Sequence, residues 1–270
     1  MFKVILYIAI TFILLTVYIK YLESRGIFFP TKNVELTPSA IDLSFEDIYV
    51  DTDDNIKIHG WFIVNSSAKY TLLLLHGNAG NIGDRFDKIG LLHGLGMNIF
   101  IIDYRGFGRS QGKVSEAGVY LDAKAAYDYL INSRKIKPEY IILYGESIGS
   151  AVAIDLAWTK KTGGLIVEGA FSKGRDMAKK IYPFLPAFLF SNIFDSLSKI
   201  KKVNVPKLFI HSENDEMIPL SLAEKLYHAA PQPKRFVKII GGHNTAFLDS
   251  QPVFLAAVGS FMKELSIDVK

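Results

Sequence analysis

One serine in the sequence stands where its hydroxyl could act as a nucleophile. Ser147 lies in the stretch YGESIGSA between Gly145 and Gly149, and an apolar run typical of a buried strand leads into it. A helical pattern rich in Ala, Ile and Leu follows directly. The two glycines allow a strand and a helix to approach without a clash between β-carbons. The motif Gly-x-Ser-x-Gly in this setting predicts a nucleophile elbow, which exposes Ser147 at the carboxyl edge of a sheet.

A serine hydroxyl needs a base beside it, and the base needs a carboxylate that orients it. Two strand-like runs downstream end in suitable residues. KLFIHSEND places Asp215 just past one strand, and RFVKIIGGH places His243 just past the next. Nucleophile, acid and histidine in this chain order suit an elbow-type site. We therefore expect Ser147, Asp215 and His243 to meet at one edge, with His243 as the base.

Other carboxylates and histidines are weaker candidates for these two roles. Glu213 and Glu216 flank Asp215, and either is an alternative for the carboxylate. The remaining histidines are weaker candidates for the base. We expect His211 to lie in the core, His228 to be exposed on a helix and His76 to shape its loop through a hydrogen bond, and His59 and His93 do not stand at a strand end.

Acyl transfer also passes through an oxyanion, which backbone N–H groups must stabilise. The residue after the nucleophile, Ile148, supplies one such N–H. The second is expected from LLHGNAGN, which follows an earlier strand and in which Gly77 and Gly80 allow the amides to turn inward. We assign the second donor to the N–H of Asn78, with Ala79 as the alternative.

The stretch DYRGFGRS, residues 103–110, is another glycine-rich segment after a strand. Its glycines and arginines suggest phosphate binding, but it lacks the Gly-Lys-Ser/Thr ending of a P-loop, and no dinucleotide fingerprint matches. We expect a structural turn beneath the site. The chain has no cysteine, which excludes disulfides, thiol nucleophiles and cysteine metal sites. The predicted chemistry requires no cofactor and no metal.

The elements that must position these residues alternate along the chain. Short, nearly continuous apolar runs, typical of strands buried on both faces, alternate with helical patterns. This alternation predicts a doubly wound α/β domain over residues 45–270, with a mostly parallel twisted sheet and helices on both of its faces. Strand-like runs cover residues 71–76, 98–104, 140–147, 164–170, 207–215 and 235–243, after a hairpin that turns at residues 53–55, and helical patterns cover residues 82–95, 115–134, 148–160, 219–230 and 251–266.

Residues 171–204 interrupt this alternation. The segment is long for a single crossover and contains the apolar stretch IYPFLPAFLF, which two prolines break. We expect a short helical cap over the carboxyl edge of the sheet, and a plain crossover with buried helices is an equal alternative.

The N-terminus forms a separate unit. Residues 4–19 have no charge, Gly or Pro, and with Lys3 and Lys20 at the ends of this run residues 1–22 reach the ~20 residues that span a bilayer. A cleaved signal peptide is the alternative, but the apolar run is long and no small-residue cleavage site follows it. Residues 23–44 are expected to be a tether. The basic residues after the span slightly favour a cytoplasmic catalytic domain.

Composition narrows the possible partners. Nearly half of the 270 residues are hydrophobic, 49%, which allows a sizeable core, and the net charge of +4 comes from dispersed lysines. A solvated lysine face is the simplest interpretation, so we expect no nucleic-acid partner.

The motifs HGNAGN, DYRGFGRS, YGESIGSA, SENDEMIP and GGHN, in this order, resemble those of the α/β-hydrolases. More closely, they are similar to membrane-anchored serine hydrolases related to protein depalmitoylases. The resemblance runs from about residue 21 to the C-terminus and includes RDMAKKIYPFLP in the cap. It implies an α/β-hydrolase fold, a triad of Ser147, Asp215 and His243, and oxyanion donors at Asn78 and Ile148. Depalmitoylases proper carry lipidated N-terminal cysteines, whereas this chain has an apolar segment there.

These observations together predict a membrane-anchored serine hydrolase that cleaves carboxylic esters or thioesters through an acyl-enzyme. A peptidase or amidase on the same scaffold and a membrane-tethered binding protein are the alternatives. The apolar cap suggests a lipid-like acyl substrate, through Phe184, Leu185, Phe188, Leu189 and Phe190.

Overall fold

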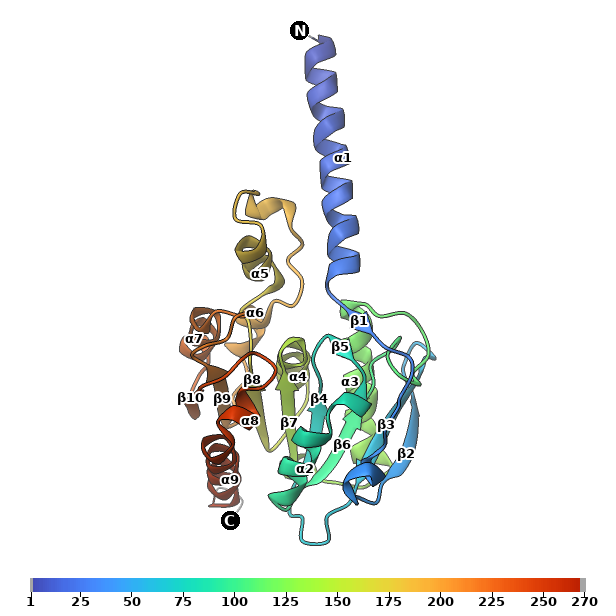
Figure 1. Ribbon diagram of the computed structural model, residues 1–270, viewed down its shortest axis with the longest axis vertical. Coiled ribbons are helices and arrows are strands. Elements are labelled where there is room, and N and C mark those ends of the chain that lie inside the picture. The colour runs from blue at the N-terminus through green and yellow to red at the C-terminus, as the bar shows by residue number, and fades with distance from the viewer. Residues whose placement is uncertain (1, 268–270) are drawn as a thin grey trace.

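An eight-stranded sheet lies at the centre of the computed structural model, which describes residues 2–267 (Figure 1). Its strands are β2 (Glu46–Asp51), β3 (Lys57–Ile63), β4 (Thr71–Leu75), β6 (Asn98–Ile102), β7 (Ile141–Glu146), β8 (Gly164–Glu168), β9 (Lys207–Ser212) and β10 (Lys234–Ile239). Their spatial order is β10-β9-β8-β7-β4-β6-β3-β2. β3 is antiparallel to both of its neighbours, and the other pairs are parallel. The six parallel strands, β4 and β6 to β10, therefore all end at one carboxyl edge.

The central strands are buried on both faces, which explains their continuous apolar sequences. Every residue of β4 is buried. Leu73 and Leu75 pack into the core layer on one face of the sheet, and Leu72 and Leu74 pack into the layer on the other. The hairpin of β2 and β3 turns at Asn55, whose φ of 61° lies in the left-handed region that asparagine tolerates.

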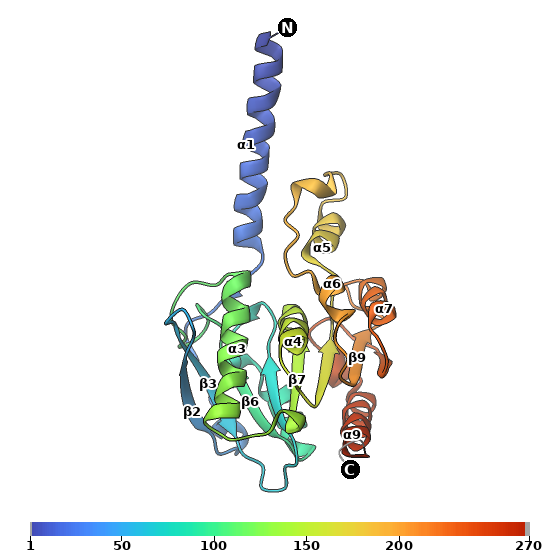
Figure 2. The ribbon, with the colours of Figure 1, turned by 180° about the vertical axis from the view of Figure 1, so that it is seen from behind.

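Helices cover both faces of the sheet (Figures 1 and 2). One core layer includes residues of α3 (Glu116–Asn132), α4 (Ile148–Thr159), α6 (Ser196–Ile200) and α7 (Leu220–Ala229). The other includes residues of α2 (Phe86–Gly94), α8 (Ala246–Asp249) and α9 (Gln251–Ile267). The predicted fold, a mostly parallel sheet with helices on both faces, is confirmed.

The segment between β8 and β9 forms the expected cap. It contains α5 (Gly174–Ile181) and the 3₁₀ helix η4 (Ala187–Leu189), and it returns to the body through α6. The part that contains α5 rises from the carboxyl edge of the sheet and lies beside the N-terminal helix in both views (Figures 1 and 2).

The N-terminal helix, α1 (Phe2–Gly26), projects from the body on the same side as the cap (Figure 1). The chain then returns to the body, where β1 (Phe29–Pro30) pairs in parallel with β5 (Ala79–Gly80). The Asn81 side chain donates to the carbonyl oxygen of Asn33 at 2.7 Å and extends this contact. Residues 23–44, expected to be a tether, thus include the last turn of α1 and a segment that is hydrogen-bonded to the body.

Candidate active site

Ser147 occupies a sharp turn between β7 and α4. Its φ of 55° and ψ of −119° are strained for a residue with a side chain. The turn is tight because a β-carbon on Gly145 would lie 2.3 Å from the carbonyl oxygen of Gly149. A β-carbon on Gly149 would lie 2.0 Å from that of Leu75. The two glycines are therefore required sterically, as the sequence motif predicts.

The side chains of Ser147, His243 and Asp215 come together at this turn. His243 Nε2 lies 3.0 Å from Ser147 Oγ, and His243 Nδ1 lies 2.7 Å from Asp215 Oδ2. The second carboxylate oxygen of Asp215 accepts the N–H groups of Met217 at 2.9 Å and Ile218 at 2.7 Å. Asp215 is thereby fixed in the one orientation that directs an oxygen to the imidazole.

The pKa values of Asp215 and His243 depend on the hydrogen bond between them. Burial opposes ionisation of Asp215, but the hydrogen bond from His243 and the N–H of Ile218 outweigh it and hold the pKa of the carboxyl below its usual value. Burial would likewise lower the pKa of His243, but its hydrogen bond to Asp215 and the nearby negative charge leave that pKa raised. The arrangement therefore favours an imidazole that accepts a proton readily.

The loop expected to hold the oxyanion lies beside Ser147. Gly77 faces this turn, since a β-carbon on it would lie 3.7 Å from that of Ser147. The segment after α1 fixes the loop, because Asn78 Nδ2 donates to the carbonyl oxygen of Ile27 at 2.7 Å, and Asn78 O accepts the N–H of Phe29 at 2.8 Å. The N–H of Ile148, the first residue of α4, has no acceptor within that helix.

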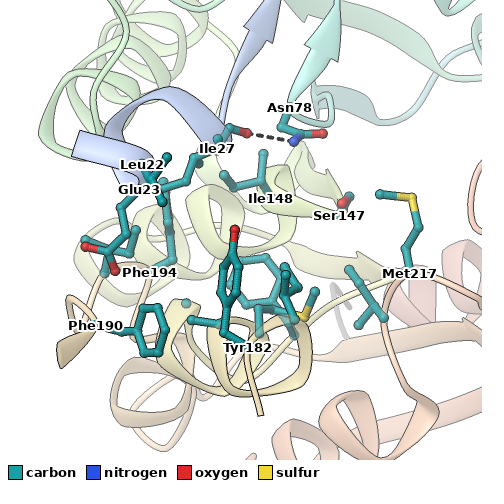
Figure 3. A pocket seen from close by; sticks show the side chains of 18 of the residues that line it. Leu22, Glu23, Ile27, Asn78, Ser147, Ile148, Tyr182, Phe190, Phe194 and Met217 are labelled. Atoms are coloured by element: carbon teal, nitrogen blue, oxygen red, sulfur yellow. Dashed lines mark hydrogen bonds between the residues drawn. The ribbon is translucent and has the colours of Figure 1, made fainter. Parts of the chain in front are cut away.

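Asn78, Ser147 and Ile148 line one apolar cavity of about 310 Å³ (Figure 3). Of the cap residues expected to contact an acyl chain, Leu185 and Phe190 line the cavity, Leu189 packs in a buried cluster with Ile19, and Phe184 and Phe188 are exposed outside the lining. The last two turns of α1, through Ile19, Leu22, Glu23 and Gly26, complete its wall. Nothing in the sequence pattern indicated this contribution from α1.

Known proteins are similar to this chain in sequence or in fold. A family model described as serine aminopeptidase, S33, matches residues 66–199. An uncharacterized protein of Mycobacterium tuberculosis is 33% identical, covering 91% of this chain and 89% of its own. The alpha/beta hydrolase domain-containing protein WAV2 of Arabidopsis thaliana is 32% identical, covering 83% of this chain and 80% of its own. The chain belongs to the α/β-hydrolase family. A solved Pyrococcus furiosus esterase has the same fold, with a TM-score of 0.74 and 23% sequence identity. The match covers 88% of the chain described here and 98% of the esterase chain.

Glu213 and Glu216, the alternatives to Asp215 in this hydrolase, have other partners. Glu216 accepts the backbone N–H of His243 at 2.9 Å and so helps to place the residue. Glu213 is at the surface, 3.8 Å from Lys238. Buried His211 lies behind the relay, with Nε2 2.9 Å from the carbonyl oxygen of Ile218, and burial lowers its pKa.

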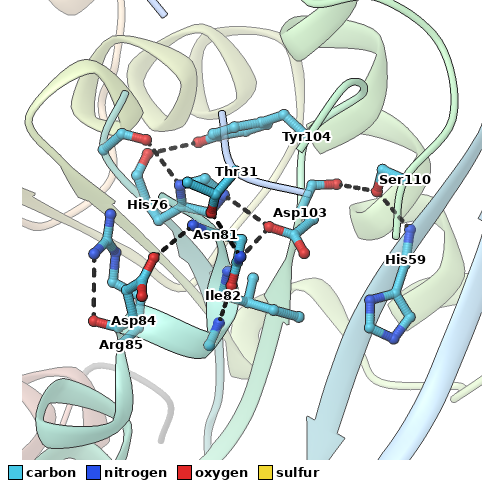
Figure 4. Close-up of polar contacts among 12 residues, drawn as sticks. Thr31, His59, His76, Asn81, Ile82, Asp84, Arg85, Asp103, Tyr104 and Ser110 are labelled. Carbon is cyan, nitrogen blue, oxygen red and sulfur yellow. Dashed lines mark hydrogen bonds and ion pairs between the residues drawn. The ribbon is translucent and has the colours of Figure 1, made fainter. Parts of the chain in front are cut away.

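The stretch DYRGFGRS of the hydrolase supports neighbouring loops (Figure 4). Asp103 Oδ1 accepts the N–H of Ile82 at 3.0 Å, and Ser110 Oγ donates to the carbonyl oxygen of Asp103 at 2.7 Å. His76, fully buried, donates from Nδ1 to the carbonyl oxygen of Gly77 at 2.7 Å. This hydrogen bond lies within the loop that carries Asn78, where the sequence places His76 as a residue that shapes the loop. Within residues 2–267, no group of three or more His, Asp or Glu side chains could hold a metal ion.

Sequence reasoning missed a buried charge cluster beneath the elbow of the hydrolase. Lys88 of α2 is 2% exposed and lies 2.6 Å from Glu168 and 3.1 Å from Glu146, the residue before the nucleophile. The hydroxyl of Tyr144 donates to Glu168. Burial opposes ionisation of Glu146, but the Lys88 charge outweighs it and lowers its pKa to about 2. A glutamate inside the serine motif was the one available signal, and it does not indicate its partner.

Proposed function

We propose that this α/β-hydrolase is a membrane-anchored serine hydrolase that cleaves carboxylic ester or thioester bonds. The observation that carries this proposal is the continuous relay from Ser147 through His243 to Asp215, with distances of 3.0 and 2.7 Å, at one end of an apolar cavity. These distances fall in the range required for nucleophilic catalysis by a serine.

The proposed reaction proceeds through an acyl-enzyme. His243 Nε2 accepts the proton of Ser147 as Oγ attacks the carbonyl carbon, and Asp215 stabilises the resulting imidazolium. The N–H groups of Asn78 and Ile148 hold the oxyanion. His243 then donates its proton to the leaving alcohol or thiol as the ester bond breaks. Water, deprotonated by the same imidazole, attacks the acyl-enzyme and releases the acid.

The apolar cavity supports an acyl substrate. A peptidase or amidase is the second candidate, and the serine aminopeptidase description of the matching family model favours it. Against it, the one carboxylate among the described residues that line the cavity is Glu23, which is engaged with Lys20 and with Ser191 of the cap. A free peptide amine would therefore lack an unengaged acidic partner there.

A fluorophosphonate probe tests the nucleophile directly. The full-length protein should be labelled at Ser147, and Ser147→Ala should abolish the labelling. The matched control Ser67→Ala, which changes an exposed serine outside the cavity, should be labelled like the wild type. A wild-type protein that resists the probe while folded would support the membrane-tethered binding protein instead.

Turnover of model substrates tests the bond type. We expect p-nitrophenyl esters and acyl thioesters to be hydrolysed and a panel of aminoacyl amides and peptides to be cleaved far more slowly. Faster cleavage of the amides would favour the peptidase.

We further propose that α1 is an uncleaved membrane anchor and that the catalytic domain is cytoplasmic. α1 contains a stretch, Phe2–Glu23, that is long and apolar enough to cross a membrane. Its last two turns also form part of the cavity wall, so cleavage after this stretch would remove part of the proposed site. The basic residues Lys20, Arg25 and Lys32, which follow the apolar run, favour the cytoplasmic side.

A further inference from the structure

The tip of the cap exposes large apolar side chains. Phe184 is 96% exposed and Phe188 is 68% exposed, and Ile181 and Tyr182 are also exposed. These four residues, which we call the cap tip, lie in one short stretch that follows the exposed lysine Lys179. A cluster of exposed aromatic and aliphatic residues beside basic ones is typical of a surface that inserts into the boundary of a bilayer.

The cap tip lies beside α1, at a level within its apolar stretch. The rings of Phe188 and Phe12 are 6.5 Å apart. Phe12 precedes Lys20 by eight residues, which corresponds to about 12 Å along a helix. If Lys20 marks the surface of the bilayer, the cap tip therefore reaches below it.

Polar contacts hold the base of the cap against the end of α1. The N–H of Ser191 donates to Glu23 Oε1 at 2.8 Å, and its hydroxyl donates to Glu23 Oε2 at 2.8 Å. Lys20 Nζ also donates to the Ser191 hydroxyl. The polar contacts thus lie at the proposed membrane surface. The ring contact of Phe12 with Phe188, and the cluster that Ile19 forms with cap residues, lie on the membrane side of them.

The cavity extends between these two elements. Leu22 of α1 and Phe190 of the cap line one end of it, whereas Ser147 lies at the other end (Figure 3). An acyl chain in this cavity would thus run from the nucleophile toward the place where α1 and the cap tip would enter the bilayer. A substrate dissolved in water would not require this direction.

We infer that the cap tip inserts into the same bilayer that α1 spans, and that the substrate is a long-chain acyl ester or thioester whose chain enters the cavity from that leaflet. This inference rests on the proposed function and adds the origin of the substrate. The lipid surface is the partner of the cap tip, and α1 is both the anchor and a wall of the acyl site.

The kinetic test compares a membrane-held substrate with a soluble one. Full-length protein is reconstituted in phosphatidylcholine vesicles and assayed with p-nitrophenyl palmitate in the bilayer and with p-nitrophenyl acetate in water. The double variant Phe184→Ser and Phe188→Ser should lose about ten-fold or more in kcat/KM on the palmitate ester, because the insertion of two aromatic side chains is lost. Its rate on the acetate ester should stay within about two-fold of the wild type, because neither residue lines the cavity.

Val64→Ser is the matched control. Val64 is exposed just after β3, which runs antiparallel to β6 and so ends at the edge of the sheet opposite Ser147. This variant should behave like the wild type on both esters. Equal losses on both esters in the double variant, or an unchanged rate on the palmitate ester, would overturn the inference.

A second measurement reports insertion directly. The chain has no cysteine, so Phe184→Cys provides a single site for an environment-sensitive fluorophore. In the vesicles, the emission should shift to shorter wavelength and be quenched by lipids that carry a nitroxide on the acyl chain. The same label on Val64→Cys should stay water-exposed, and a water-exposed label at position 184 would contradict insertion.

The two proposals fail in different ways. A wild-type protein that hydrolyses neither ester and resists the fluorophosphonate probe refutes the proposed hydrolase. A protein that is labelled at Ser147 and hydrolyses the acetate ester, but is indifferent to the cap-tip substitutions on the palmitate ester, refutes only entry from the membrane.

Discussion

At the level of single residues, the hydrogen bonds of Asp215 fix the orientation of the His243 imidazole in the proposed site. Asp215 divides its two oxygens between His243 and two backbone N–H groups, those of Met217 and Ile218. A carboxylate held at both oxygens loses little freedom when the imidazole becomes charged. Neither flanking glutamate has this arrangement, although Glu216 supports the backbone of His243.

Replacing Asp215 tests this arrangement. Asp215→Asn should lower kcat about 10⁴-fold, because the amide would stabilise the wrong tautomer of His243. The base must be neutral to act, so kcat/KM of the wild type should rise with pH through the pKa of His243, which lies above its ordinary value. Loss of the negative charge should lower this pKa and move the acidic limb of the pH profile to lower pH. Glu213→Gln, at an exposed position, should leave both quantities unchanged, and a similar loss in that variant would contradict the assignment.

At the level of elements, the pair of β1 and β5 connects the N-terminal helix to the loop that carries Asn78. The side chain of Asn78 donates to Ile27 O, and its carbonyl oxygen accepts the N–H of Phe29. The position of the proposed oxyanion donor thus depends on a segment about 50 residues earlier in the chain. We therefore expect the end of α1 to affect catalysis as well as attachment.

Asn78→Ala separates the side chain from the backbone donor. The N–H remains, but the bond to Ile27 is lost, so kcat should fall about five-fold, equivalent to about 1 kcal/mol for one hydrogen bond. The control Asn98→Ala removes two side-chain hydrogen bonds, to Thr71 and to the N–H of Asn65, at the opposite edge of the sheet. It should cost at least as much stability in urea unfolding as Asn78→Ala, with no change in kcat. Equal changes in kcat for both variants would argue against a role in positioning.

The buried ions beneath the elbow join α2 to β7 and β8. Lys88 is the common partner of Glu146 and Glu168, and it lies 4.3 Å from the ring centroid of Phe247 in α8. Since removal of one partner leaves buried charge without compensation, this cluster matters more to stability than surface pairs do.

Lys88→Met should therefore lower the free energy of unfolding by about 3–5 kcal/mol, measured in urea at pH 7. Because the pKa of Glu146 is depressed to about 2, its stabilisation is present above its ordinary pKa of 4.5 and is lost as the pH falls toward 2. The variant should lack this part of the acid dependence. Lys57→Met, which removes an exposed pair with Asp51 at 3.7 Å, should cost less than about 1 kcal/mol. A loss no larger than that in Lys88→Met would show that the cluster is not stabilising.

At the level of the whole molecule, α1 and the cap project on the same side of the sheet, above its carboxyl edge (Figures 1 and 2). If α1 spans a bilayer, this geometry turns the edge that carries Ser147 toward the membrane. The opposite edge, with the amino ends of the parallel strands, then faces the aqueous phase.

Membrane attachment and topology can be measured on the full chain. The protein should remain in the membrane fraction after alkaline carbonate extraction, and mass spectrometry should find the N-terminal peptide uncleaved. A reporter fused at the C-terminus should be active in the cytoplasm and silent outside it. Recovery of a shortened soluble chain would indicate a signal peptide, and the opposite reporter pattern would reverse the proposed orientation.

The sequence by itself determined the features that depend on local chemistry. The glycines around Ser147 specify the elbow, because only residues without a β-carbon permit that approach of strand and helix. The alternation of apolar runs and helical patterns determined the doubly wound sheet, because periodicity follows from which faces are buried. The sequence also predicted that Ser147, Asp215 and His243 would meet, since each stands just past a strand of one parallel sheet.

Only the tertiary structure decided contacts between distant segments. The hydrogen bond between Asp215 and His243, the pairing of β1 with β5, the partners of Lys88 and the position of α1 beside the cap are all of this kind. These contacts have no local period, because they depend on how complete elements pack against one another. A helix typical of a membrane anchor could therefore become a wall of the cavity without any sign in its sequence.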